Sequence, residues 1–188
     1  MTRCRFPAAL MLLVLAACAG LNPDHRVMAP DFDVVGRVLV SGETRAFSSS
    51  LRWRHEAGHD ALWLMTPLGQ VLVHITTDPA GATLTTADQQ EYRARSASAL
   101  TERALGWALP LAELRHWVLA QPVPAQPAAD VQRDAGGRLE RLEQGGWRLQ
   151  FAYDGAQPLP RLVDLERGGQ RMRLVIDQRR DPAALHLQ

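Results

Sequence analysis

The chain has 188 residues, with 21 arginines, no lysine and 20 acidic residues, so its formal net charge is +1. This balance argues against a nucleic-acid-binding protein, which needs a strongly basic face. The length suits one domain with a substantial core but is short for two. The two cysteines, Cys4 and Cys18, lie near the N-terminus, so the rest of the chain is expected to fold without disulfides or thiolate chemistry.

The N-terminus has the pattern of a secretory signal peptide. Two arginines precede the apolar run Ala8 to Ala17, which is too short for a membrane-spanning helix of roughly 20 residues. The run leads into Leu-Ala-Ala-Cys18, which resembles the lipobox of bacterial lipoproteins. We therefore predict that residues 1–17 are a lipoprotein signal peptide and that the mature chain is lipid-anchored through Cys18. Alanine rather than aspartate at position 19 favours sorting to the outer membrane.

Removal of 17 of the 188 residues leaves 171, which we divide into a tether and one domain. Residues 18–30 contain two prolines and few apolar residues and show no period, so they are predicted to form the tether. Residues 31–188 are predicted to form the single folded domain, because regular alternation of apolar and polar residues begins there.

The first half of the domain is predicted to be an antiparallel meander. Its clearest pair of strands is Phe32 to Val40 and Phe47 to Trp53, which the turn residues Ser41-Gly42-Glu43 separate. Alternation on both sides of a short turn is typical of a hairpin. Shorter segments of the same kind follow, each bounded by glycine, proline or aspartate, at 61–65, 70–76, 82–86 and 91–93.

Two short helices are predicted in the middle of the chain. Residues 97–105 are rich in helix-forming residues, with Ser96 as the N-cap and Gly106 as the stop. A second helix is predicted from Pro110 to Val118, where apolar residues recur at helical spacing and are best explained as core packing. The proline-rich segment from Gln121 to Ala129 is expected to cross the surface without regular structure.

Strand-like alternation returns in the last part of the chain, at 138–143, 147–151, 161–165 and 172–176. The fold class is therefore mainly β (α+β). A twisted antiparallel sheet of about ten strands curls, and its concave face is buried by closure toward a barrel or by helices. Periodicity alone leaves open whether the interior is solid or hollow, because the five tryptophans suit either case.

One motif suggests catalysis. The run His55-Glu56-Ala57-Gly58-His59 matches H-E-x-x-H, in which two histidines one helical turn apart bind zinc. Here the run lies between two predicted strands, and Gly58 and Asp60 are turn-forming residues. We therefore expect a solvated hairpin loop and no metal site.

Other catalytic patterns are weaker. Ser48, Ser49 and Ser50 lie within a predicted strand and lack the G-x-S-x-G context of hydrolases. The chain has no phosphate-binding loop or dinucleotide fingerprint. We expect neither an enzyme nor a cofactor, and a lipid-anchored hydrolase ranks last among the alternatives.

Several local patterns occur together in one order along the chain. They are Phe32–Val40 with the pair Gly36-Arg37, Phe47–Trp53, Thr66-Pro67-Leu68-Gly69-Gln70, Leu105–Trp117, Gln144-Gly145-Gly146-Trp147, Leu159-Pro160 and Arg173–Ile176. Together they resemble the LolB family of outer-membrane lipoprotein receptors over nearly the whole mature domain. The Pro-Leu-Gly loop and the Gln-x-Gly-Trp segment are the most specific parts of this resemblance.

The resemblance implies a curved antiparallel sheet that forms an open, incomplete β-barrel, with helices covering an apolar cavity. It implies a receptor that accepts lipoproteins from the periplasmic carrier LolA and inserts them into the outer membrane, without a cofactor. We accordingly expect a monomer on the periplasmic face of the outer membrane, with LolA and acylated lipoproteins as partners.

Two groups of site residues follow from the alternation and the resemblance. The turn Pro67-Leu68-Gly69 resembles the protruding loop of the family, whose leucine meets the membrane. The side chains predicted to line or support the acyl cavity are Leu51, Trp53, Leu64, Trp117, Trp147, Phe151, Leu174 and Ile176. The alternative from another functional class is a structural or adaptor lipoprotein with a solid core, in which the same tryptophans serve only as packing.

Overall fold

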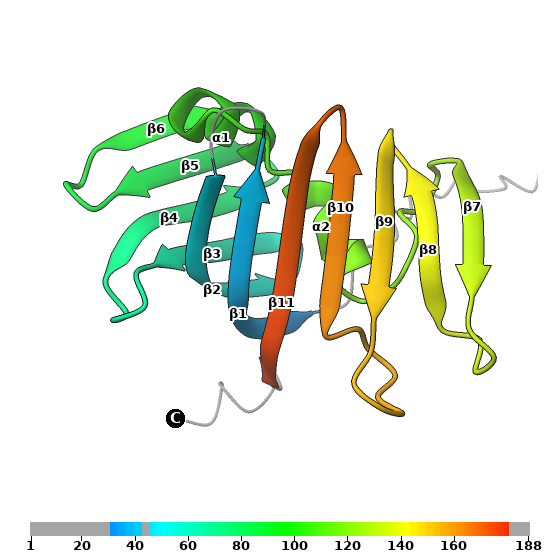
Figure 1. The fold of residues 1–188 in the computed structure, drawn as a ribbon. Helices are drawn as coiled ribbons and strands as arrows, with labels where there is room; N and C mark the ends of the chain where they lie inside the picture. Colours follow the sequence, from blue (N-terminus) through cyan, green and yellow to red (C-terminus); the bar gives the residue numbers. More distant parts are fainter. Residues whose placement is uncertain (1–30, 43–45, 181–188) are drawn as a thin grey trace, which may run out of the picture.

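The computed structural model describes residues 31–42 and 46–180, so the predicted signal peptide, Cys18 and the predicted tether lie outside the described residues. The first half contains β1 (Phe32–Ser41), β2 (Ala46–Glu56), β3 (His59–Met65), β4 (Val71–Asp78), β5 (Gly81–Thr86) and β6 (Glu91–Ala94). Helices α1 (Ala97–Leu105) and α2 (Leu111–Trp117) follow. The second half contains β7 (Ala128–Arg133), β8 (Leu139–Gln144), β9 (Trp147–Ala152), β10 (Leu162–Arg167) and β11 (Gln170–Arg180) (Figure 1).

All the described strands form one antiparallel sheet in the order β6-β5-β4-β3-β2-β1-β11-β10-β9-β8-β7. Each half of the chain is a meander, and the pairing of β1 with β11 joins the two meanders at the centre of the sheet. The outermost strands, β6 and β7, are not paired with each other, so the curved sheet stays open (Figure 1). The prediction of an incomplete, mainly β barrel is confirmed.

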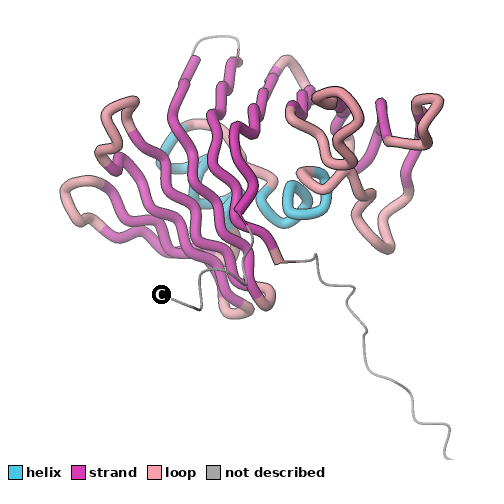
Figure 2. Tube along the Cα trace, turned by 90° about the horizontal axis from the view of Figure 1, so that it is seen from below, coloured by secondary structure: helices cyan, strands magenta, loops and turns pink. Residues whose placement is uncertain are grey.

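Alternation along the strands defines a buried inner face and an exposed outer face. In β9, for example, Trp147, Leu149 and Phe151 are buried, whereas Arg148 and Gln150 are exposed. The same period of two runs through β1, β2, β3 and β10. Both helices lie against the inner face (Figure 2), and the burial of this apolar surface drives the association of helices and sheet.

The helices begin and end where the sequence predicts. The hydroxyl oxygen of Ser96 accepts a hydrogen bond from the backbone N–H of Ala99, and Gly106 ends α1 in the left-handed conformation at φ +76°. Pro110 immediately precedes α2. Within the described part of the chain, neither helix has the length and hydropathy needed to span a membrane.

The prediction of an irregular surface crossing from 121 to 129 is wrong at its C-terminal end, where β7 begins at Ala128. All residues of β7 are exposed, and its pairing with β8 contains register shifts. An edge strand with no buried face has no reason to alternate apolar and polar residues. The sequence pattern therefore gives no signal for it.

The seam between β1 and β11 depends on a close approach at Gly36. A Cβ atom at this position would lie 2.0 Å from the backbone oxygen of Val175. The register of the two strands shifts between Val35 and Gly36, so the β11 backbone bulges toward the glycine. Only a residue without a side chain allows this pairing.

We predict that Gly36→Ala lowers the free energy of unfolding by about 1 to 3 kcal/mol or more. The added methyl group would overlap the backbone oxygen of Val175, which can move only if the β11 backbone moves with it. The matched control is Gly42→Ala, because a Cβ at Gly42 would have no neighbour within 4 Å. Urea denaturation of both variants measures the difference. Equal free energies of unfolding would contradict the role given to Gly36.

Candidate functional site

A small apolar cavity lies between the inner face of the sheet and the helical segment. Its volume is about 20 Å³, which is room for one or two water molecules at most. The sheet contributes side chains from β1, β2, β3 and β11, and the segment from Trp107 to Leu114 closes the other side. The lining residues are all apolar: Val38, Leu51, Trp53, Leu62, Leu64, Trp107, Leu109, Leu111, Leu114, Met172 and Leu174.

The predicted cavity residues divide into two groups. Leu51, Trp53, Leu64 and Leu174 line this cavity. Trp117, Trp147, Phe151 and Ile176 are also buried on the inner side, but they belong to the surrounding core and do not border the cavity. All eight side chains are thus turned inward, and their role in binding acyl chains remains a prediction.

The helical side of the cavity is held by hydrogen bonds between α1 and the following loop. The hydroxyl of Thr101 accepts from the backbone N–H of Leu109 at 2.8 Å, and the hydroxyl of Ser98 donates to the backbone oxygen of Leu109 at 2.6 Å. These bonds place Leu109 over the cavity, followed by Leu111 and Leu114 on the buried side of α2.

Next to the cavity lies a buried polar cluster, the Asp60 cluster, formed by Trp53, His55, Asp60, Thr77 and Arg115. The indole N–H of Trp53 and Nδ1 of His55 donate to one carboxylate oxygen of Asp60, at 3.0 and 2.8 Å. The hydroxyl of Thr77 and the guanidinium of Arg115 donate to the other, both at 2.7 Å. The cluster therefore joins β2, β3 and β4 to helix α2.

The carboxylate of Asp60 is charged in this setting. Its burial alone would raise its pKa, but the hydrogen bond from His55 and the positive charge of Arg115 outweigh burial and hold the pKa below its usual value. A carboxylate with four donors is well satisfied, which explains how a charged side chain is accommodated beside an apolar cavity.

The H-E-x-x-H run lies in the β2–β3 hairpin, but the prediction of a solvated loop is wrong for most of it. His55 and Glu56 end β2, His59 begins β3, and His55 is fully buried. Ala57 and Gly58 form the turn with positive φ angles of 48° and 82°. His55 is paired with Asp60 and points inward, whereas His59 is paired with Glu56 and is exposed. Neighbouring pairs of an antiparallel ladder point to opposite faces, so the two histidines cannot share a metal ion.

Of the three serines in β2, Ser49 has hydrogen bonds that define its role. Ser49 is buried, and its hydroxyl donates to the backbone oxygens of Ser50 and Met65, at 2.9 and 2.8 Å. Both partners of this hydroxyl are backbone oxygens, so neither is a histidine that could act as its general base. In the described ranges, no group of three or more His, Cys, Asp or Glu side chains is placed to hold a metal ion.

The predicted membrane loop connects β3 to β4. The backbone N–H of Gly69 donates to the oxygen of Thr66, and the N–H of Thr66 donates to the oxygen of Gln70, both at 2.9 Å. Gly69 has φ +84°, a conformation that glycine adopts without strain. This tight loop presents Leu68 with 91% of its surface exposed.

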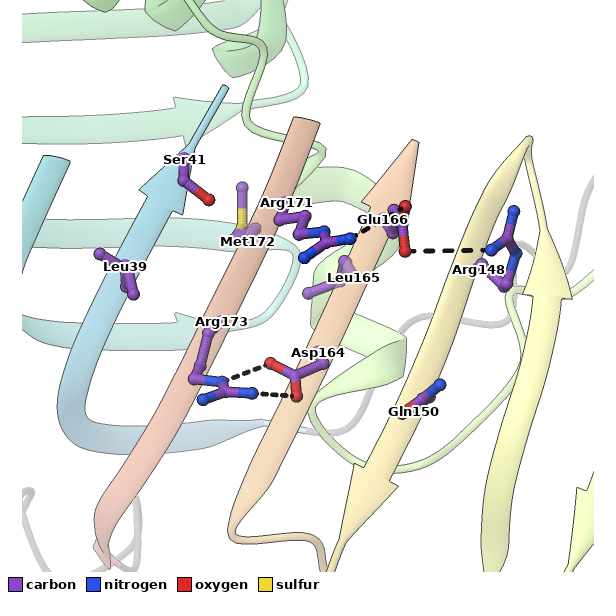
Figure 3. Close-up of a pocket in the computed structure, with 10 residues that line it drawn as sticks. All are labelled: Leu39, Ser41, Arg148, Gln150, Asp164, Leu165, Glu166, Arg171, Met172 and Arg173. Carbon is purple, nitrogen blue, oxygen red and sulfur yellow. Dashed lines mark hydrogen bonds and ion pairs between the residues drawn. The ribbon is translucent and has the colours of Figure 1, made fainter. Parts of the chain in front are cut away.

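The outer face of the sheet carries a wider hollow of about 370 Å³, on the side turned away from α2 (Figure 3). Arg173 and Asp164 form a two-bond ion pair in it, and Arg148 and Arg171 both approach Glu166 (Figure 3). The charged lining makes this hollow unsuitable for an acyl chain.

Sequence reasoning missed the Asp60 cluster and most of the lining residues on the helical side. One signal was present, because the alternation in β3 places Asp60 on the same face as Leu62 and Leu64. A charged residue in an inward register indicates a buried polar network. The pairing of Asp60 with Arg115, 55 positions away, has no sequence signal.

Comparison with known proteins identifies the family. The family model described as outer membrane lipoprotein LolB matches residues 30–178. The outer-membrane lipoprotein LolB of Azoarcus sp. strain BH72 is 35% identical over 185 residues, covering 93% of this chain and 95% of that protein. The Nitrosomonas europaea protein of the same name is 33% identical over 195 residues, covering 93% of this chain and 92% of that protein.

A solved structure, a putative outer membrane lipoprotein-sorting protein domain from Vibrio parahaemolyticus, aligns with a TM-score of 0.49 and 11% identity, covering 81% of this chain and 86% of that one. The family assignment does not depend on this distant likeness. It depends on the family model and on relatives about one-third identical over nearly the full length. The chain therefore belongs to the outer-membrane lipoprotein LolB family.

Proposed function

We propose that this protein is an outer-membrane lipoprotein receptor that accepts lipoproteins from the periplasmic carrier LolA and inserts them into the outer membrane. The acyl chains of the cargo occupy the space between the helices and the inner face of the sheet. The observation that carries the proposal is the apolar cavity of a LolB-family chain, lined by side chains of four strands and covered by the segment from Trp107 to Leu114.

The free-energy cost of exposing acyl chains to water explains why such a site is needed. Each methylene group of an acyl chain costs about 0.8 kcal/mol in water, so a lipid anchor crosses the periplasm only inside an apolar container. Transfer from carrier to receptor needs no nucleotide if the receptor binds the acyl chains more tightly. A difference of about 1.4 kcal/mol gives a tenfold bias.

The direct test is transfer from the carrier. A complex of LolA with an acylated lipoprotein is mixed with the receptor in vesicles, and the distribution of the lipoprotein is followed over time. We expect the lipoprotein to leave LolA and to become membrane-bound only when the receptor is present. Equal transfer without the receptor would contradict the proposal.

We predict that Trp107→Ala weakens binding of a fluorescent fatty acid about tenfold, which corresponds to about 1.4 kcal/mol, because the indole supplies apolar lining surface for the bound chain. The matched control is Trp63→Ala. Trp63 is also half-buried, but it stacks on His74 on the outer side of the sheet, with ring centres 4.8 Å apart. Titration of both variants with the fatty acid measures their affinities. An equal loss of affinity in the two variants would mean that the cavity is not the binding site.

We predict that Leu68→Glu folds and accepts cargo normally but delivers it poorly to membranes. The side chain is 91% exposed, so the substitution should change stability by no more than about 0.5 kcal/mol. A charged residue at the tip would oppose entry into the apolar part of the bilayer. Leu39→Glu is the control, because Leu39 is 42% exposed on the outer face of β1. Normal delivery by Leu68→Glu would disprove the role of the loop.

We predict that Cys18→Ser leaves the domain folded and moves the protein to the soluble periplasmic fraction. The predicted lipid attachment is a single residue outside the described domain. Cell fractionation with a high-salt wash, followed by immunoblotting, measures this. If the variant stayed in the outer membrane, anchoring would have another cause.

The adaptor alternative has one observation in its favour. The cavity of about 20 Å³ is nearly filled by its own lining, as the core of a purely structural lipoprotein would be. A fatty-acid probe separates the two functions, since an adaptor with a solid core shows no saturable binding. The receptor proposal requires saturable binding that competes with acylated cargo.

A further inference from the structure

The structure represents a closed form of the site. The space between sheet and helices is about 20 Å³, and a single water needs roughly 10 to 15 Å³ on the same measure. An acyl chain is far larger, so cargo cannot enter while the segment from Trp107 to Leu114 keeps its present position. Binding therefore requires this segment to move away from the sheet.

The hydrogen bonds that hold α2 to the sheet are concentrated at the C-terminal end of the helix. At its C-terminal end, the indole N–H of Trp117 donates to the side-chain oxygen of Gln144 at 3.1 Å. There the guanidinium of Arg179 also donates to the backbone oxygen of Val118 at 2.9 Å. These contacts fix the end of the helix to β8 and β11.

The next contact between α2 and the sheet, closer to the cavity, is the bond from Arg115 to Asp60. Within the part of the chain that the structure describes, it is the one ion pair that joins a helix to the sheet. Leu109 is held by hydrogen bonds to α1 rather than to a strand. The contact of Arg115 with Asp60 thus stands between the fixed end of α2 and the side chains that cover the cavity.

The Asp60 cluster is built so that this contact can break. If Arg115 leaves, Asp60 keeps the donors of Trp53, His55 and Thr77, all of which belong to the sheet. A buried carboxylate that retains three hydrogen bonds avoids most of the penalty of an unpaired charge.

The arginine side also favours release. Arg115 makes one hydrogen bond to Asp60, and its Nε is buried without a hydrogen-bond partner among the described residues. Its side chain already reaches solvent, with 22% of its surface exposed. Movement of α2 would therefore hydrate a donor that the closed form leaves unsatisfied.

We propose that Asp60 and Arg115 are positioning residues that latch helix α2 over the acyl cavity and set how readily the cavity opens to cargo. The latch also touches the cavity wall, because Trp53 both donates to Asp60 and lines the cavity. This inference rests on the proposed acyl-binding function. A latch of this kind lowers the apparent affinity for cargo, because the apparent association constant is the intrinsic constant multiplied by the fraction of molecules that are open.

The test uses the mature chain carrying Cys18→Ser, in solution, with a fluorescent fatty acid as the probe. We expect Arg115→Met to lower the melting temperature and yet to bind the probe about tenfold more tightly and with faster association, because more molecules are open. Asp60→Asn should act in the same direction, since it removes the negative charge that pairs with Arg115 and leaves one acceptor oxygen where the cluster uses two. A purely structural pair predicts lower stability with equal or weaker binding.

Two further variants serve as controls. Arg115→Lys restores a positive donor and should return the affinity toward the wild-type value, because only one hydrogen bond has to be replaced. Arg148→Met removes an arginine whose ion pairs, with Glu143 and Glu166, lie on the outer face of the sheet. It should leave probe affinity unchanged. Tighter binding by Arg148→Met would show that the effect is not specific to the latch.

A second measurement avoids destabilised variants. Spin labels at Ala112→Cys, on the exposed side of α2, and at Gln150→Cys, on the outer face of β9, report the distance between helix and sheet. We expect this distance to change when the fatty acid is added. If the protein binds the probe without movement of α2, the latch is refuted and the receptor proposal stands. If neither the wild type nor Arg115→Met binds the probe, both proposals fail.

Discussion

The pairing of β1 with β11 is the contact on which the rest of the structure depends. These are the first and last strands described, and their antiparallel ladder joins two meanders that are otherwise linked through the core and through the polar contacts of α2. Because the seam lies at the centre of the sheet, both free edges lie at the ends, and the sheet curls without closing. The helices are inserted between the two meanders in the chain, so they can cover the concave face without interrupting a hairpin. Gly36 permits this seam, because any side chain there would meet the β11 backbone.

The inner face has two tasks that compete for the same side chains. It must supply the apolar burial that stabilises the domain, and under the proposed function it must also accept acyl chains. In the closed form the first task dominates, because Leu109, Leu111 and Leu114 fill the space from the helical side. Cargo would then replace protein side chains as the apolar partner of the sheet. The hydrogen bonds that hold α2 to the sheet oppose this replacement.

Polar side chains are distributed accordingly. On the outer face, ion pairs such as Arg173 with Asp164 lie in contact with water and contribute little to stability. On the inner side, the Asp60 cluster is buried, and its carboxylate is satisfied mainly by donors from the sheet. The single bond to Arg115 adds the helix to this network. The hairpin that contains the H-E-x-x-H run thus contributes one histidine to the cluster and leaves the other at the surface.

Local features of this protein were determined by the sequence alone. Period-two alternation together with bounding turn residues located ten of the strands, and Ser96 and Gly106 located the ends of α1. Capping, turns and alternation all depend on residues that are neighbours in the chain. The turn at Leu68 was recognisable for the same reason. Only the tertiary structure decided the seam between β1 and β11, the exposed edge strand β7, the residues that border the cavity, and the partnership of Asp60 with Arg115. These features depend on contacts between segments that are far apart in the sequence. Local patterns such as alternation and capping reflect only nearby residues, so they do not indicate which distant segment a residue will contact.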